Sequence, residues 1–200
     1  MKNLGSPGEH KAQKMFSSSN RALVFYNNQM LHCLNPLMQQ FIQRQEMVFI
    51  ATADTSGECD SSFRAGLPGF IHVLDSTTLI YPEYRGNGVM ASLGNILENP
   101  HIGLVFIDFF ETTIGLHVNG KARIIENQEV ALLPHLPLAI QLALNVKGRR
   151  KPERWVIISV VEAYIHCSKH VPLLRKLDKK IHWGTDSSQH KGGDYFKTKT

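Results

Sequence analysis

Two arginines in glycine-rich surroundings are the residues of this sequence best suited to binding an anion. Arg64 ends an alternating segment just before Ala-Gly-Leu-Pro-Gly, and Arg85 lies in the polar loop 83–88. That loop follows an apolar run, 78–81, and precedes an amphipathic stretch that stops at Asn99-Pro100. Glycines let the backbone approach a ligand closely, and free N–H groups at a helix start attract anions. Guanidinium groups bind phosphate through two parallel hydrogen bonds. The pattern predicts a phosphate site; two surface arginines in separate loops are the plainer interpretation.

The segment around residue 166 offers two other kinds of chemistry. His166, Cys167 and His170 could hold a metal ion, but neighbours at a strand end point to opposite faces and do not readily share one ion. Cys167, close to a histidine and to Lys169, could be an activated nucleophile, yet no hydrolase or protease signature accompanies it. Ordinary structural roles are therefore favoured for these side chains.

The composition is typical of a soluble globular domain, with 42% hydrophobic and 20% charged residues among 200. No apolar run approaches the roughly 20 residues needed to span a bilayer, and the N-terminus lacks the apolar core of a signal peptide. Three widely spaced cysteines indicate no disulfide framework. These features predict a cytoplasmic protein without membrane association.

The charge is unevenly distributed along the chain. Residues 147–200 contain 13 Lys and Arg against 5 Asp and Glu, whereas residues 1–146 contain 9 against 12. A basic segment can bind nucleic acid, but no aromatic interleaving or known nucleic-acid-binding motif accompanies this one. We predict no nucleic-acid partner, and a basic surface that is solvated or serves an anionic small molecule.

The elements that must position these residues are mainly strands. Short apolar or alternating runs predict strands at 47–53, 59–65, 70–74, 78–81, 101–107, 113–125 and 154–167. Asn119-Gly120 predicts a bulge or bend in the sixth of these. Six or seven strands, mostly joined by short turns and without βαβ repetition, predict an antiparallel barrel or sandwich.

Helices flank this predicted sheet. Helical periods cover 21–34, 36–45 and 127–146, the last broken by two prolines, and Asn35-Pro36 reads as an N-cap followed by a first-turn proline. A single helix interrupts the strands between Tyr81 and His101, with Met90, Leu93, Ile96 and Leu97 predicted to face the core. The domain is placed at 21–185, after a flexible lead-in at 1–20 and before a polar tail at 186–200.

Several ordered segments resemble the pyridoxamine 5′-phosphate oxidase-like, FMN-binding split-barrel family. They are Phe49-Ile-Ala-Thr-Ala-Asp54, Gly57-Glu-Cys-Asp-Ser-Ser-Phe-Arg-Ala-Gly66, Pro68-Gly-Phe70, the stretch 81–100, Gly115-Leu-His-Val-Asn-Gly-Lys-Ala-Arg123 and Glu162-Ala-Tyr-Ile-His-Cys-Ser-Lys169. The resemblance implies a mainly β fold with flanking helices: a six-stranded antiparallel split β-barrel. It also implies a homodimer with FMN at the subunit interface.

Members of this family contact the FMN phosphate with an arginine at the end of an early strand and with the loop and helix start after a later strand. The resemblance implies cofactor-binding positions at Arg64, Tyr81, Pro82, Arg85, Gly86, Asn87 and Ser92, and positions beside the flavin ring at Lys169 and Trp183. Gly88 and Val89 stand where many relatives carry basic residues, so phosphate neutralisation falls on the two arginines. The tryptophan-and-arginine signature of true pyridoxamine phosphate oxidases is not clear near the C-terminus, so the resemblance does not extend to that reaction.

The favoured function is an FMN-dependent oxidoreductase of unknown substrate, with NAD(P)H as a candidate electron donor. In such a site the cofactor supplies the hydride chemistry, and Lys169 is the candidate for stabilising the reduced flavin anion. A non-catalytic flavin- or haem-binding or redox-sensing protein is the alternative, because no general acid or base is evident beside the ring. For haem, His117 and His166 are the candidate ligands, although a hydrogen-bonded structural histidine is the commoner role.

Overall fold

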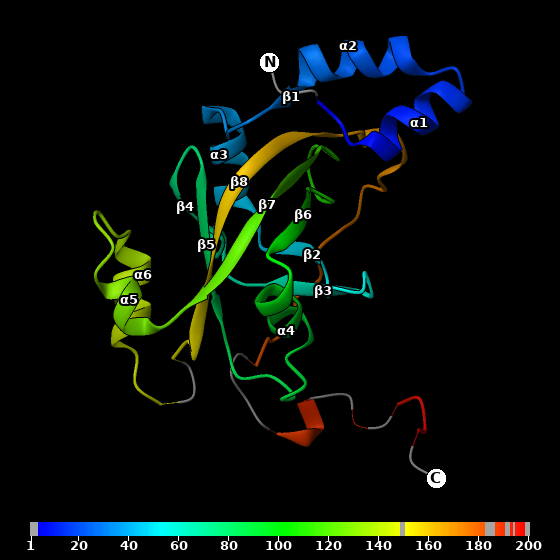
Figure 1. Cartoon of the computed structure of the whole chain (residues 1–200). Helices are drawn as coiled ribbons and strands as arrows, with labels where there is room; N and C mark the ends of the chain where they lie inside the picture. Colours follow the sequence, from blue (N-terminus) through cyan, green and yellow to red (C-terminus); the bar gives the residue numbers. More distant parts are fainter. Residues whose placement is uncertain (1–3, 149–150, 183–186, 191–192, 194, 199–200) are drawn as a thin grey trace.

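The computed structural model describes residues 4–148, 151–182, 187–190, 193 and 195–198. Its strands form one antiparallel sheet in the order β3-β2-β6-β7-β8-β5-β4, with the two-residue β1 paired to the far part of β8 (Figure 1). The strand bounds are β1 Met30–Leu31, β2 Met47–Ala53, β3 Cys59–Ala65, β4 His72–Asp75, β5 Thr78–Glu83, β6 His101–Ile107, β7 Gly115–Ile125 and β8 Arg154–His166. Because β3 and β4 end this path without pairing to each other, the barrel is split, as the family resemblance predicted.

The helices are α1 Pro7–Met15, α2 Ser19–Gln29, α3 Pro36–Arg44, α4 Ala91–Glu98, α5 Asn127–Ala131 and α6 Leu138–Asn145, with short 3₁₀ turns at Ser168–His170 and Ser188–His190. The predicted start of α3 is confirmed: the Asn35 side chain accepts a hydrogen bond of 2.9 Å from the backbone N–H of Met38. The predicted lead-in contains a helix, α1, whose first turn is capped by Ser6. None of the described helices is long and apolar enough to cross a membrane.

Strand β8 runs through the middle of the molecule, from near α5 and α6 to near β1 and α2 (Figure 1). Its pairing with β7 shifts register between Asn119 and Gly120, which confirms the predicted bulge. Gly120 is required by close approach, because a Cβ there would lie 2.4 Å from the carbonyl oxygen of Ser159. The bulge lets the long pair of strands β7 and β8 bend, as a barrel requires.

Two apolar clusters hold these elements together. The larger fills the inside of the sheet and includes Ile50, Leu104, Val118 and Ile158. The smaller lies under α5 and α6 and is built around Trp155, whose indole Nε1 donates a hydrogen bond of 2.9 Å to the side chain of Asn127. The second cluster therefore fixes the start of β8, where the functional residues described below gather.

The helix α4 differs in two positions from the predicted core face. Leu93 and Ile96 are buried as predicted, but Leu97 is 77% exposed and Met90 is 47% exposed. Met90 precedes the helix in a left-handed conformation, with φ 56°. Ser92 lies on the buried side of α4 and is hydrogen-bonded to Asp60 of the sheet. This hydrogen bond orients the helix so that Leu97 is turned to solvent.

Strand β5 is longer than predicted. The prediction ended it at Tyr81, before the proline, but it continues through Pro82 to Glu83 and pairs with Trp155 and Arg154 of β8. Its other neighbour, β4, pairs only with residues 78–80, so Pro82 lies where β5 is an edge strand and its missing N–H breaks no ladder. This extension places Glu83 inside the sheet.

Candidate functional site

A large cavity lies where β3, β5 and β8 meet the start of α4. Its volume is about 1090 Å³. It is lined by Asp60, Ser62 and Arg64 of β3, Pro82 and Glu83 of β5, Tyr84, Arg85, Gly86, Asn87, Gly88, Val89 and Met90 of the connecting loop, Ala91, Ser92 and Leu93 of α4, and Glu153 and Arg154 beside β8. We call this the arginine cavity.

The structure brings together six of the positions that the resemblance implied: Arg64, Pro82, Arg85, Gly86, Asn87 and Ser92. Tyr81 is adjacent but fully buried in the core, and it does not line the cavity. Lys169 is exposed in the turn after β8, beyond the opposite end of that strand from Arg154. Trp183 lies outside the described residues.

The loop between β5 and α4 is shaped by its own backbone. The Asn87 side chain accepts a hydrogen bond of 3.0 Å from the N–H of Val89, and Gly88 has φ +88°, a conformation that favours glycine. Met90, the residue before α4, provides no side-chain cap for the first N–H groups of the helix. These groups border the cavity, and uncapped N–H groups at a helix start favour an anion.

Arg64 is held by a carboxylate that the sequence analysis did not single out. Its Nε donates a hydrogen bond of 2.9 Å to Oε1 of Glu83, and its Nη1 donates one of 3.3 Å to the carbonyl of Phe63. Burial raises the pKa of the Glu83 carboxyl, and the attraction of Arg64 and Arg154 only partly opposes this effect. Glu83 was assigned to a loop, so the sequence pattern gave no signal that it would be buried.

Arg154, the first residue of β8, adds a third guanidinium to the cavity. Its Nη2 lies 3.8 Å from the carboxylate of Glu153, and its Nη1 contacts the sulfur of Met90 at 3.6 Å. Its Nε is buried and, among the described residues, has no hydrogen-bond partner. The hydroxyl of Tyr81 is also buried and has no hydrogen-bond partner among the described residues. Because buried polar atoms are nearly always paired in native proteins, these two orphaned atoms suit a site that is completed by a ligand.

Ser92 has a different role from the one expected of a direct phosphate donor. Its hydroxyl donates a hydrogen bond of 2.9 Å to the carboxylate of Asp60 and lies 2.9 Å from the hydroxyl of Ser62. Ser92 is only 4% exposed. Ser92 therefore anchors the first turn of α4 to β3, and so fixes the position of the uncapped N–H groups.

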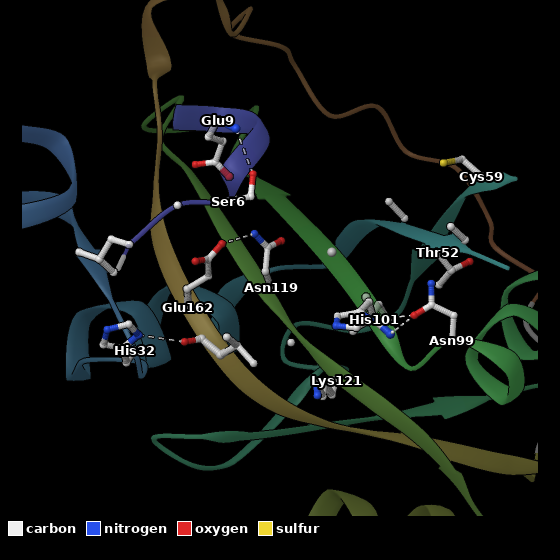
Figure 2. A pocket seen from close by; sticks show the side chains of 18 residues that line it. Ser6, Glu9, His32, Thr52, Cys59, Asn99, His101, Asn119, Lys121 and Glu162 are labelled. Carbon is white, nitrogen blue, oxygen red and sulfur yellow. Dashed lines mark hydrogen bonds between the residues drawn. The ribbon is translucent and has the colours of Figure 1, made fainter. Parts of the chain in front are cut away.

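A second cavity of about 580 Å³ lies between the N-terminal segment and the face of β2, β6, β7 and β8 (Figure 2). On one side of it, the side chain of Asn119 donates a hydrogen bond of 2.8 Å to the carboxylate of Glu162, with Glu9 nearby. On another side, Nδ1 of His101 lies 2.7 Å from the side-chain oxygen of Asn99. Among the residues that the structure describes, no arginine and none of the implied cofactor positions lines this cavity, so it is a poor candidate for a phosphate.

A pair of histidines lies near the far end of β8. Nε2 of His117 and Nδ1 of His166 are 2.9 Å apart, and the ring of Tyr164 stacks on His117 with centroids 4.7 Å apart. Burial, together with the neighbouring His166, lowers the pKa of His117. No group of three or more His, Cys, Asp or Glu side chains that could hold a metal ion occurs among the described residues.

An open antiparallel barrel with a helix-covered cavity at its strand ends is the architecture of the FMN-binding split barrels. The family model described as pyridoxamine 5′-phosphate oxidase matches residues 34–167, more than half of the chain. The protein therefore belongs to the pyridoxamine 5′-phosphate oxidase family. The helices α1 and α2 precede the matched region.

Several solved structures are similar to this chain. A substituted form of HupZ from Group A Streptococcus has a TM-score of 0.50 and 22% identity, covering 66% of this chain and 99% of that chain. An FMN-binding protein from Syntrophomonas wolfei has a TM-score of 0.46 and 12% identity over 80% and 99% of the two chains. The haem storage protein HutZ from Vibrio cholerae has a TM-score of 0.40 and 14% identity over 66% and 94%. Among curated proteins, no relative matches the sequence.

Proposed function

We propose that this protein binds FMN with its phosphate in the arginine cavity and acts as a flavin-dependent oxidoreductase. The observation that carries the proposal is the meeting of Arg64, Arg85 and the uncapped start of α4 around one cavity. Guanidinium groups and helix N-termini are the two commonest phosphate-binding devices, and here they come from three separate segments. The family membership supports the same assignment.

Each part of the cavity has a distinct task in this proposal. Arg64 and Arg85 neutralise the phosphate, and the N–H groups at the start of α4 donate hydrogen bonds to its oxygens. Gly86 and Asn87 shape the loop so that its backbone can approach the ligand, and Ser92 holds the helix in place. When bound, the flavin supplies hydride transfer; the protein binds it, orients it and sets the charge around it.

We further propose that the flavin site is completed by a second copy of the chain. Lys169 lies past the end of the 13-residue strand β8 that starts at the arginine cavity, a separation of roughly 40 Å at 3.3 Å per residue. Contact between Lys169 and a flavin in that cavity would therefore come from the partner of a homodimer. The exposed rings of Phe49 and Phe63, 5.5 Å apart on neighbouring strands, offer an apolar surface that such a partner would cover.

The proposal is tested on the purified full-length chain. We expect a yellow protein with a flavin spectrum, or a colourless one that takes up added FMN and binds it more tightly than riboflavin, which lacks the phosphate. Bleaching by NADH or NADPH would identify the electron donor and favour the enzyme over a passive flavin carrier. A chain that takes up neither flavin would overturn the proposal.

The histidine pair favours one other candidate, haem binding. His117 and His166 each spend one ring nitrogen on the other, which leaves a second nitrogen on each for a ligand. A Soret band on adding haemin, lost in a His117→Ala variant that still binds FMN, would support this function. Unchanged haem uptake by that variant and by His166→Ala would contradict it.

A further inference from the structure

Glu83 is a carboxylate at the centre of the proposed phosphate site. Its side chain is 11% exposed, and Oε1 accepts the hydrogen bond of 2.9 Å from Nε of Arg64. A negative group in this position already neutralises one of the two arginines on which the phosphate depends. Glu83 therefore competes with the proposed phosphate for Arg64.

The charges around Glu83 are balanced. The charged groups that line the cavity with it are Asp60 and Arg64 on β3, Arg85 on the loop, and Glu153 and Arg154 beside β8; the phenols Tyr81 and Tyr84 are the other ionisable groups beside it. Among the described residues, three guanidinium groups thus face three carboxylates, so the positive and negative charges of this lining are equal in number. Asp60 is engaged by the hydroxyl of Ser92, and Glu153 lies by Arg154 with a side chain that is 40% exposed.

A phosphate dianion entering this cavity brings two negative charges close to a buried carboxylate. Like charges at short distance in a poorly solvated site favour a state in which one of the two groups is protonated. Glu83 and the phosphate form such a pair, because Glu83 is 11% exposed and already accepts a hydrogen bond from Arg64. Tyr81 cannot relieve the repulsion, because its phenol is neutral and its pKa is raised further by burial.

We propose that Glu83 and a phosphate group bound beside Arg64 share one proton taken up from solvent, so that phosphate binding is coupled to proton uptake through Glu83. The inference rests on the proposed FMN site and names a residue outside the set implied by the family resemblance. The shared proton lies between an oxygen of Glu83 and an oxygen of the phosphate, and Glu83 still accepts the hydrogen bond from Nε of Arg64. Affinity for phosphate then falls as the pH rises.

The experiment is calorimetric titration of FMN into the full chain at pH 8, where the phosphate is a dianion. Repeating the titration in two buffers of different ionisation enthalpy gives the number of protons taken up. Wild type should take up a substantial fraction of one proton. Glu83→Gln, which keeps the acceptor but not the charge, should take up none and should bind FMN about tenfold more tightly.

Two controls make the result specific. Glu153→Gln removes the same charge from a more exposed place in the cavity, and it should keep the proton uptake and change the affinity less than threefold. Riboflavin, without a phosphate, should bind wild type and Glu83→Gln equally. Proton uptake in Glu83→Gln equal to wild type would overturn the inference, as would FMN binding to Glu83→Gln no tighter than to wild type; the latter would show that Glu83 only orients Arg64.

Failure of the proposed function gives a different result. Inorganic phosphate, titrated in the same two buffers, tests Glu83 without the flavin. A chain that binds phosphate with proton uptake but does not bind FMN would overturn the FMN proposal and support the role of Glu83. A chain that binds neither ligand would overturn both.

Discussion

The two ends of strand β8 differ in how the polar groups around them are paired. At its start, Arg154 joins a cavity where guanidinium and carboxylate groups face one another, and two buried polar atoms, Nε of Arg154 and the hydroxyl of Tyr81, are left unpaired. At its end, His166 pairs with His117 under a stacked tyrosine, and burial lowers the pKa of His117. The first end keeps charges that a ligand can use, whereas the second favours a neutral His117 ring that is hydrogen-bonded to the ring of His166.

This difference indicates which end is prepared for an anion. Two histidine rings that are hydrogen-bonded to each other gain little from a phosphate, while arginines whose charges are only locally balanced gain strong hydrogen bonds. The start of β8 is also rigid, because Trp155 sits in the cluster under α5 and α6. A preorganised frame with unsatisfied donors is what a tight binding site needs.

The sharpest test of the comparison is loss of a guanidinium from the cavity. Arg85→Ala should weaken FMN binding by about 10- to 100-fold, the usual value of a charge-assisted hydrogen bond of about 1.5–3 kcal/mol. Riboflavin affinity, measured by the same fluorescence titration, should change little. Full FMN affinity in this variant would show that the phosphate is bound elsewhere.

The connection between the two ends is tested at the bulge. Gly120→Ala places a Cβ 2.4 Å from the carbonyl oxygen of Ser159, too close for a real contact, so β7 and β8 must separate. We expect a loss of stability of about 1–3 kcal/mol in denaturant unfolding, as for other overpacked sites. Gly86→Ala, where a Cβ meets open space, is the matched control and should unfold like wild type. Equal stability of Gly120→Ala would mean that the bulge adapts freely.

The histidine end should respond to acid. A pKa lowered in the folded state means that the unfolded chain binds the proton more readily, so stability is lost as the pH falls through the unfolded value of about 6.5. The unfolding midpoint of wild type should therefore drop between pH 7 and pH 5. His117→Gln should reduce that drop. An identical pH profile in the variant would contradict the assignment.

The smallest effect is expected at Lys169. If this residue approaches the flavin ring from the partner subunit, Lys169→Ala should leave FMN affinity within about twofold, because a single exposed charge contributes little. The reduction potential of the bound flavin should fall, since a positive charge near the ring stabilises its reduced anion. An unchanged potential would remove Lys169 from the site and leave the arginine cavity as the whole of it.

Much of the architecture could be predicted because it follows from local rules. The Asn35-Pro36 cap, the hairpin of β2 and β3 and the bulge at Asn119-Gly120 each depend on residues close in sequence. The arginine cavity was also indicated, because glycines and arginines mark the loops that form it. Met90 and Leu97 were misplaced because the orientation of α4 depends on a hydrogen bond from Ser92 to Asp60, 32 residues away.

The sequence by itself determined antiparallel strands joined by short turns, with arginines and a glycine-rich loop at the strand ends, because turn chemistry and strand periodicity depend on residues close in sequence. The choice of a split barrel over a sandwich came from the resemblance of several ordered segments to a known family. Tertiary structure decided that Glu83 lies buried against Arg64 and that Lys169 lies far from the cavity within one chain. Both depend on which strands pair: β5 runs past Pro82 because it has β8 on one side and no neighbour on the other. If β5 ended at Tyr81 and a loop followed, the carboxylate of Glu83 would be solvated. Because the strand continues, Glu83 shares a cavity with Arg64, Arg85 and Arg154.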